Sequence, residues 1–396
     1  MPSIPVPSTS AELLARMISF DTVNRRVDGH GGTETELTSY LEQIARAWGF
    51  VTKRLPIDDN DTNLLVYGPP APGAPTLLFD SHLDTVSVDG MTIDPFAARI
   101  HQGRLYGRGA CDTKGSGAAM LWALKRLSER RAPFDQPANV AILFSVDEEV
   151  AMTGVLAFVR KQMPELDWRP NAVVVGEPTE MQIVAATGGI ARWSIRTRGV
   201  AAHSSNPAKG RSAISAMMKV IDALETSYIP NLDANDPLVG RAQCSINLIS
   251  GGTQINVIPE TCEIHVDRRV VPGEDPAGAL PDVEAILDAL RARHDGLEVE
   301  QGAPRLDPPL EPALSRQFSE KVGSVLTRHG LNPQPIGVPY GTNASKYAAA
   351  GIPAIVMGPG CIDQAHTAEE WIALDQLELS EKVYFDLMCG ASQCFE

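Results

Sequence analysis

Residues 141–149 read Ala-Ile-Leu-Phe-Ser-Val-Asp-Glu-Glu, a short apolar run that ends in three acidic residues. A continuous apolar run of this length is typical of a strand covered on both faces in a parallel sheet. Two adjacent glutamates, Glu148 and Glu149, are costly to place just past such a strand unless a cation compensates their charge. This stretch therefore predicts an α/β fold with a cation site at the end of one of its strands.

Other apolar runs of the chain have the same character. Residues 77–79, 172–175 and 354–357 are short and rich in valine, isoleucine and leucine, and a helix expected at 117–127 supplies a crossover between two strands. Strands that alternate with helices in this way predict α/β architecture with a mainly parallel sheet.

The pattern changes near residue 188. From there the chain shows an alternating strand, a helix, two strands, a second helix and a short strand, and this βαββαβ order is typical of a ferredoxin-like module. The α/β pattern then resumes. We therefore expect a larger α/β domain built from residues 1–187 and 300–396, with an inserted ferredoxin-like α+β domain at 188–299. A chain of 396 residues is long enough for two separate cores.

Composition excludes several classes of partner. With 34 basic and 49 acidic residues the net charge is -15, which argues against a nucleic-acid surface or an anionic membrane as partner. No apolar stretch approaches the roughly 18 residues of a membrane span, and residues 1–10 lack the features of a signal peptide. We therefore expect a soluble, cytoplasmic protein.

The six cysteines form no CxxC pair, so the sequence indicates neither a disulfide framework nor a structural zinc knuckle. Cys111 lies beside Asp112 and is a conceivable metal ligand. Burial as a small core residue is the simpler expectation for its thiol.

Acidic and histidine residues follow several of the expected strands. Loops at the carboxyl ends of parallel strands converge at one edge of a sheet, so residues distant in sequence can meet there. Taken singly, each carboxylate is more simply a helix cap or a solvated turn residue, and the histidine at 366 a polar surface residue. Their joint occurrence instead predicts a two-metal hydrolase site. Its candidate members are His82, Asp84, Asp112, Glu148, Glu149, Glu177 and His366.

Residue type also suggests roles within this set. Carboxylates and imidazoles together suit zinc, manganese or cobalt better than calcium. Asp84 is a candidate to orient the ring of His82, because a ligating histidine usually donates its second N–H to a nearby acceptor. Of Glu148 and Glu149, one can ligate a metal while the other accepts a proton, because neighbouring side chains point in different directions.

Several strings in this chain resemble the M20 family of di-zinc amidohydrolases and carboxypeptidases, and within it the acetylornithine deacetylase and succinyl-diaminopimelate desuccinylase branch. The resemblance covers nearly the whole chain. Its motifs are residues 81–86 (SHLDTV), 107–115 (GRGACDTKG), 147–149 (DEE), 176–179 (GEPT), 202–205 (AHSS), 251–259 (GGTQINVIP) and 358–366 (GPGCIDQAH).

The resemblance implies a role for each member of the set. It makes the α/β domain the catalytic one, with two Zn²⁺ ions for which Co²⁺ or Mn²⁺ can substitute. Asp112 would bridge the two ions, and Glu148 would be the general base and acid, with Asp84 orienting His82. The remaining ligands would be His82 and Glu177 on one ion and Glu149 and His366 on the other.

The inserted domain is, by the same resemblance, a lid and dimerisation domain. His203 would reach the active site of a partner subunit in a homodimer and stabilise an oxyanion; the alternative is a surface histidine that caps a helix. Asn256 and Arg269 would bind substrate. Arg268 stands beside Arg269, and strand alternation places only one of the two on the site face.

The function implied is hydrolysis of the amide bond of a small-molecule N-acyl amino acid. The alternatives are a metallo-carboxypeptidase that cleaves short peptides, a succinyl-diaminopimelate desuccinylase-like enzyme, and an inactive homologue that only binds amino acids. Two positions depart from the usual family pattern. Asn343 replaces an aspartate and Cys361 a serine, and both are expected near the substrate pocket.

Overall fold

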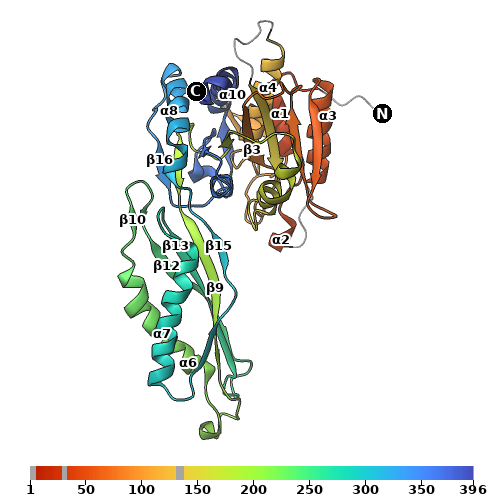
Figure 1. Ribbon diagram of the computed structural model, residues 1–396. Coiled ribbons are helices and arrows are strands. Elements are labelled where there is room, and N and C mark those ends of the chain that lie inside the picture. The colour runs from red at the N-terminus through yellow and green to blue at the C-terminus, as the bar shows by residue number, and fades with distance from the viewer. Residues whose placement is uncertain (1–5, 29–33, 131–137, 396) are drawn as a thin grey trace. The chain divides into compact units, whose positions relative to one another are not determined.

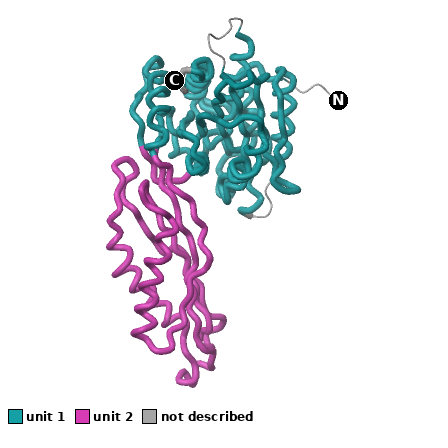
Figure 2. Tube along the Cα trace, viewed as in Figure 1, with its two compact units in different colours: residues 1–185, 312–336, 342–396 teal, residues 186–311, 337–341 magenta. Residues whose placement is uncertain are grey.

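The computed structural model describes residues 6–28, 34–130 and 138–395, and the chain divides into two compact units (Figures 1 and 2). Unit 1 comprises Met1–Ala185, Pro312–Ile336 and Thr342–Glu396, and unit 2 comprises Ala186–Glu311 and Gly337–Gly341. The sequence placed the end of the inserted domain at residue 299. The structure extends it to Glu311, because β15 (Arg305–Asp307) still pairs with β9 (Gly189–Arg198) of the same unit.

The predicted mainly parallel α/β sheet is confirmed in unit 1. Four parallel strands form its centre, and antiparallel strands flank them. The strands in spatial order are β1 (Val51–Pro56), β2 (Thr62–Tyr67), β6 (Asn139–Ser145), β3 (Thr76–His82), β7 (Ala172–Val175), β17 (Ala354–Val356), β8 (Val184–Thr187) and β16 (Ile336–Val338). The central strands are buried along almost their whole length, as their unbroken apolar runs predicted.

Helices bury their apolar faces against this sheet. Thr9 caps α1 by accepting a hydrogen bond from the backbone N–H of Glu12 (3.1 Å), and Leu13, Leu14 and Met17 of that helix are fully buried. The α-helices of unit 1 are α1 (Ser10–Ile18), α2 (Arg25–Asp28), α3 (Thr35–Ala47), α4 (Lys114–Ser128), α5 (Thr153–Ala157), α8 (Pro312–Arg328), α9 (Ala344–Ala349) and α10 (Leu374–Cys389). Short π and 3₁₀ turns continue α5 over Phe158–Gln162 and Met163–Glu165, and others lie at Ile362–Gln364 and Ala391–Phe395.

A small antiparallel sheet in unit 1 was not predicted. It consists of β4 (Arg99–His101), β5 (Arg104–Tyr106) and β18 (Trp371–Ala373), in the order β18-β5-β4. Strands of three residues are too short to show a hydrophobic period. This sheet joins the segment near residue 105, just before the loop that carries Asp112, to the segment near residue 371, just after His366.

Unit 2 confirms the predicted βαββαβ module. Its main sheet has the order β12-β13-β9-β14, with every neighbour antiparallel. The elements are β9, α6 (Ala213–Ala223), β12 (Gln243–Gly251), β13 (Thr261–Val270), α7 (Ala279–Arg293) and β14 (Glu298–Gln301), together with a small hairpin of β10 (Asn235–Asp236) and β11 (Gly240–Arg241). Further π and 3₁₀ turns span Pro207–Lys209, Leu224–Tyr228, Ile229–Asn231 and Pro276–Gly278.

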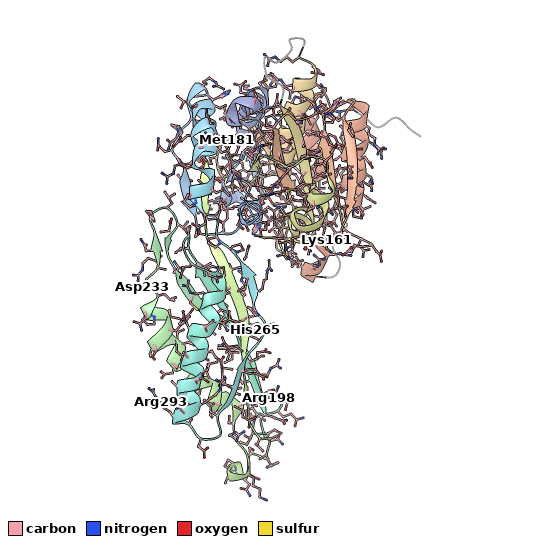
Figure 3. The ribbon with its side chains drawn as sticks, in the orientation of Figure 1. Lys161, Met181, Arg198, Asp233, His265 and Arg293 are labelled. Atoms are coloured by element: carbon pink, nitrogen blue, oxygen red, sulfur yellow. The ribbon has the colours of Figure 1, made fainter. Side chains whose placement is uncertain are left out.

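The two faces of the main sheet in unit 2 differ. Trp193 of β9 and Ile264 of β13 pack with Met217 of α6 and Leu287 of α7 into one core, and Figure 1 shows both helices on the same side of the sheet. The opposite face is polar and accessible, as the exposed His265 of β13 illustrates (Figure 3). Within the three described ranges, no helix is both long and apolar enough to cross a bilayer.

Candidate metal centre

The carboxyl ends of three parallel strands bring the predicted residues of unit 1 together. Strand β3 lies between β6 and β7, with His82 opposite Ser145 and Asp80 opposite Val175. His82 is the last residue of β3, the glutamate pair follows β6, and Glu177 follows β7. Convergence at one sheet edge therefore occurs as the strand pattern predicted.

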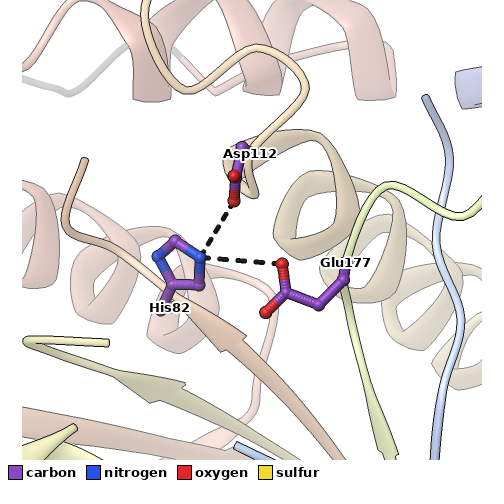
Figure 4. A group of neighbouring side chains, drawn as sticks. All are labelled: His82, Asp112 and Glu177. Carbon is purple, nitrogen blue, oxygen red and sulfur yellow. Dashed lines mark hydrogen bonds and ion pairs between the residues drawn. The ribbon is translucent and has the colours of Figure 1, made fainter. Parts of the chain in front are cut away.

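One candidate ligand group consists of His82, Asp112 and Glu177, all buried (Figure 4). The His82 Nε2 atom lies 3.1 Å from Asp112 Oδ1 and 3.9 Å from Glu177 Oε2. The other ring nitrogen, Nδ1, is 2.9 Å from the backbone carbonyl of Asp84, which can only accept a hydrogen bond. Nδ1 therefore carries the proton when the ring is neutral, which leaves the Nε2 lone pair available to a cation.

A second candidate group consists of Asp112, Glu149 and His366. The His366 Nε2 atom lies 3.3 Å from Asp112 Oδ2 and 3.2 Å from Glu149 Oε1, and half of the His366 side chain is exposed. Asp112 thus offers one carboxylate oxygen to each group. A carboxylate shared in this way is the bridging ligand that a pair of divalent cations requires.

Several groups of this site have a raised pKa and so favour their protonated forms. Burial, together with neighbouring carboxylates such as Glu149, raises the pKa of Glu148 to about 8, although His82 acts in the opposite direction. Burial and Asp112 raise the pKa of Glu177 well above its usual value. Hydrogen bonds from His366 to Asp112 and Glu149 raise the pKa of that imidazole to about 10. Protons thus compensate the clustered carboxylates, and bound divalent cations would displace them.

Asp84 acts on His82 mainly through its backbone. Its carboxylate oxygen Oδ1 lies 3.5 Å from His82 Nδ1, farther than the carbonyl oxygen. That carboxylate instead accepts hydrogen bonds from the backbone N–H groups of Glu148 (3.0 Å) and Glu149 (3.1 Å) and from the Asn24 side-chain amide (2.9 Å). Asp84 therefore holds both glutamates as well as the histidine.

The loop that carries the two glutamates has a further anchor in Asp147. This residue has φ 58°, a left-handed conformation that aspartate tolerates better than most residues. Its carboxylate accepts hydrogen bonds from Thr153 Oγ1 (2.6 Å) and from Asn24 Nδ2 (2.9 Å), and it forms an ion pair with Arg26. Asn24 therefore joins Asp84 to Asp147, a role that nothing in its local sequence indicated.

His203 and Asn256 belong to unit 2. The backbone N–H of Ser204 donates to the Asn256 carbonyl (3.0 Å), so the two segments lie side by side. The backbone N–H of Ser205 donates to His203 Nδ1 at 3.2 Å. With Nδ1 accepting, a neutral His203 carries its proton on Nε2, where it can donate to an oxyanion.

Arg269, also in unit 2, lies on the accessible face of the sheet, whereas Arg268 is buried. Alternation along β13 thus separates the two arginines as expected. Arg269 Nε lies 2.9 Å from Asp267 Oδ1, and Arg192 pairs with the same carboxylate. Arg269 also lines a cavity of about 410 Å³ together with Arg241, Gln243, Ser245, Asn247 and Tyr340.

Asn343, one of the two positions that depart from the family pattern, lies in the interior of unit 1. Its side chain is buried, and its amide donates hydrogen bonds to Asp80 Oδ2 (3.2 Å) and Ser145 Oγ (3.1 Å). The Tyr347 hydroxyl donates to the same Asp80 oxygen at 2.9 Å. An aspartate at 343 would place a second carboxylate against that of Asp80, so an amide is the better partner at this position.

The thiol of Cys111 is buried and donates to the backbone carbonyl of Cys361 at 3.3 Å. Burial raises the pKa of this thiol, which keeps it protonated. Among the residues that the structure describes, Cys111 belongs to neither candidate ligand group. Cys361 itself pairs through its backbone with Thr179, two residues after Glu177.

Glu370 has a role that no sequence pattern indicated. Its side chain is fully buried and accepts hydrogen bonds from Arg108 Nη1 (2.8 Å) and from the backbone N–H groups of Gly109, Cys111 and Asp112 (2.9–3.0 Å). Two adjacent glutamates, 369 and 370, precede a strand too short to predict, so their sequence could not distinguish the buried one from the exposed one.

Comparison with protein families places these motifs in a known group. A family model described as Peptidase family M20/M25/M40 matches residues 78–389. Among curated proteins, acetylornithine deacetylase from Myxococcus xanthus is 29% identical over 381 residues, which cover 93% of this chain and 94% of the relative. Acetylornithine deacetylase from Klebsiella pneumoniae (strain 342) is also 29% identical, with 91% and 92% covered.

Solved structures with lower sequence identity share the fold. The aminopeptidase PepT from Bacillus cereus ATCC 10987 superposes with a TM-score of 0.76 at 20% identity, over 98% of both chains. An M20 family metallo-carboxypeptidase from Sulfolobus solfataricus has a TM-score of 0.75 at 18% identity, over 97% of this chain and 99% of that one. A dinuclear metal-binding peptidase of the M20 family from Bacillus subtilis has a TM-score of 0.71 at 16% identity, over 97% and 98%.

Proposed function

The chain belongs to peptidase family M20/M25/M40 and is a hydrolase of amide bonds, and we propose that it removes the acyl group from an N-acyl amino acid at a dinuclear zinc centre. The observation that carries this proposal is the sharing of Asp112 between two groups of potential ligands, with Glu148 beside them. Both curated relatives described above are acetylornithine deacetylases, which supports a deacylase over a peptidase.

The residues fit a pair of divalent ions. His82 and Glu177 would complete one coordination sphere, Glu149 and His366 the other, and Asp112 would bridge them. Mixed imidazole and carboxylate ligands suit Zn²⁺, for which Co²⁺ or Mn²⁺ can substitute. When bound, such ions lower the pKa of a coordinated water and polarise a substrate carbonyl.

Glu148 is the proposed general base and acid. Its pKa of about 8 in the metal-free protein reflects burial next to other acids, and two nearby cations would favour its carboxylate form. In that form Glu148 accepts a proton from the attacking water and later delivers it to the nitrogen of the leaving amine. The Asp84 carboxylate accepts a hydrogen bond from the backbone N–H of Glu148 and so holds the backbone of this residue beside the proposed ligands.

Unit 2 supplies the proposed contacts to substrate. Arg269 would bind the carboxylate of the amino acid, with Asn256 as a second polar contact. His203 would donate from Nε2 to the oxyanion that forms as the carbonyl is attacked. We propose that this histidine acts in the active site of a partner subunit, so that a complete site requires a homodimer.

The surface of unit 2 offers a place for such a dimer. Strand β12 is an edge of the main sheet, so one side of its backbone is available to pair with another strand. Leu248 and Ile249 on this strand are 63% and 61% exposed, and Met218 on α6 is 65% exposed. A second copy that pairs edge to edge about a two-fold axis would cover these apolar side chains.

A substrate panel tests the proposed function. Zinc- and cobalt-loaded enzyme is assayed with N-acetylornithine, succinyl-diaminopimelate, N-acetyl derivatives of neutral and acidic amino acids, and a set of dipeptides. The acidic substrates are included because Arg241 lines the same cavity as Arg269. Faster hydrolysis of dipeptides than of every acyl amino acid would favour a metallo-carboxypeptidase. Amino-acid binding without turnover or metal uptake would instead identify an inactive homologue.

A further inference from the structure

Glu370 occupies an unusual position for an acidic side chain. It is fully buried in unit 1, and both of its carboxylate oxygens accept hydrogen bonds. Oε1 accepts hydrogen bonds from the backbone N–H groups of Cys111 (2.9 Å) and Asp112 (3.0 Å). Oε2 accepts from the backbone N–H of Gly109 (3.0 Å) and from Arg108 Nη1 (2.8 Å). One carboxylate therefore binds four donors that all belong to residues 108–112.

We propose that Glu370 is a positioning residue that holds Asp112 where its carboxylate can bridge two cations. This inference rests on the proposed metal centre, but not on the identity of the substrate or on the deacylation chemistry.

The conformation of the loop explains why it needs such an anchor. Gly109 has φ 81°, and an added Cβ there would lie 2.9 Å from Thr85 Cγ2, so the chain turns sharply in a crowded place. The turn directs three backbone N–H groups toward the interior, where an unpaired donor is costly. A carboxylate can accept all of them, because each of its oxygens has two lone pairs.

The anchor acts directly on the proposed bridging residue. The hydrogen bond from the Asp112 backbone N–H to Glu370 fixes the backbone from which the Asp112 side chain extends. From there Asp112 Oδ1 reaches His82 and Oδ2 reaches His366. A small rotation of this backbone would move both oxygens, and hence would disturb both coordination spheres together.

Glu370 also connects the two segments that carry these residues. It lies four residues after His366 and directly before β18, and its backbone carbonyl accepts from the N–H of Gly107 (3.0 Å). Strand β18 pairs with β5, with Trp371 opposite Tyr106. The small sheet thus aligns the two segments, and the carboxylate of Glu370 locks the loop that follows β5.

The variant Glu370→Gln tests this assignment. Glutamine keeps the size of the side chain but replaces one acceptor oxygen by an NH₂ group, so in either orientation two donors face another donor. Glu369→Gln is the matched control, because Glu369 is exposed and accepts only from Thr92 (3.0 Å) among the hydrogen bonds of the described residues. Arg108→Gln removes the buried ion pair but leaves the three backbone N–H groups with their acceptor.

Metal affinity is the decisive measurement, made by chelator competition with Zn²⁺ well below the melting temperature of each variant. We expect Glu370→Gln to weaken both metal equivalents by about 10- to 100-fold. It should also change the absorption spectrum of the Co²⁺-loaded protein. Glu369→Gln should match the wild type, and Arg108→Gln should lower thermal stability while it retains metal affinity.

The proposal is overturned if folded Glu370→Gln binds both metal ions with wild-type affinity. It is also overturned if Arg108→Gln loses as much metal affinity as Glu370→Gln. If Glu370→Gln does not fold, Glu370→Asp replaces it, because the charge is kept while the carboxylate retreats by about 1.5 Å. Normal metal binding in Glu370→Asp would overturn the proposal in the same way. Because no turnover is measured, a failure of the proposed deacylase activity leaves this test intact.

Discussion

The carboxylate of Asp84 accepts hydrogen bonds from the backbone N–H groups of both Glu148 and Glu149, at 3.0 and 3.1 Å. The same residue offers its backbone carbonyl to His82. One buried aspartate thus joins the end of β3 to the loop after β6, and so sets the distance between a candidate ligand and the candidate base.

Replacement of Asp84 by asparagine should disturb stability and metal binding together. Asparagine keeps one acceptor oxygen, so in either orientation its NH₂ group would face the backbone N–H of residue 148 or that of residue 149. We expect the free energy of unfolding to fall by about 2–3 kcal/mol and metal affinity to fall by about tenfold or more. Chemical denaturation and metal titration measure the two effects. Asp89→Asn, at an exposed position of the following loop, should change neither.

Replacement of Glu148 should lower activity, whereas replacement of Glu149 should lower metal binding. Glu148→Gln should lower kcat by about 10²- to 10⁴-fold while both metal equivalents stay bound. Glu149→Gln should lose metal from the site that it shares with His366. Elemental analysis beside steady-state kinetics separates the two outcomes. Retained activity in Glu148→Gln would remove this residue from the role of base.

Metal stoichiometry should reveal the shared ligand. Because Asp112 contributes an oxygen to both groups, Asp112→Ala should lose both metal equivalents. His366→Ala removes a member of one group only and should keep a metal beside His82 and Glu177. Elemental analysis after dialysis against a weak chelator gives the count. Equal losses in the two variants would contradict a bridging role for Asp112.

Mixed dimers test whether His203 acts across a subunit interface. His203→Ala should lower kcat with little effect on metal content. Glu148→Gln should lower kcat because its own site lacks the general base. If the histidine serves the partner subunit, co-refolded mixtures of the two variants contain one intact site in each heterodimer. Activity should then return to roughly a quarter of the wild type for random pairing. No recovery from a demonstrated heterodimer would place His203 in its own subunit's site. Leu248→Lys should prevent the recovery if β12 forms the interface.

Glu34 should make the stability of the metal-free protein depend on pH. This side chain is 6% exposed, and its burial, with the nearby charge of Asp84, raises its pKa from 4.5 to about 8. Below pH 4.5 it is protonated in both states. As the pH rises toward 8 the unfolded chain loses this proton more readily, so folding is progressively disfavoured.

Glu34→Gln should therefore leave the melting temperature nearly unchanged at pH 4.5 and stabilise the protein at pH 9 by roughly 2–4 kcal/mol. Thermal unfolding of the metal-free protein at the two pH values measures the difference. A stabilisation of equal size at both would mean that packing, and not ionisation, explains the effect.

Long apolar runs made much of the fold predictable. The sequence predicted the four parallel strands β3, β6, β7 and β17, because strands buried on both faces need continuous apolar sequence. It also predicted the βαββαβ order of unit 2, because strands with one buried face show alternating apolar and polar residues. Strand β1 was missed because its residues are largely exposed, and strands β4, β5 and β18 because they have three residues each.

The sequence by itself determined which chemistry is possible. Acidic and histidine residues stand after successive strands, and their motifs match a family of amide hydrolases. Strand order alone is enough to bring such residues to one edge of a sheet.

Only the tertiary structure decided how these groups are held. It buries Glu370 against the loop that carries Asp112, buries Asn343 against Asp80, and places Asn24 between Asp84 and Asp147. These contacts join segments separated by as many as 263 residues. Their formation depends on burial and on the direction of each donor, which local sequence does not encode.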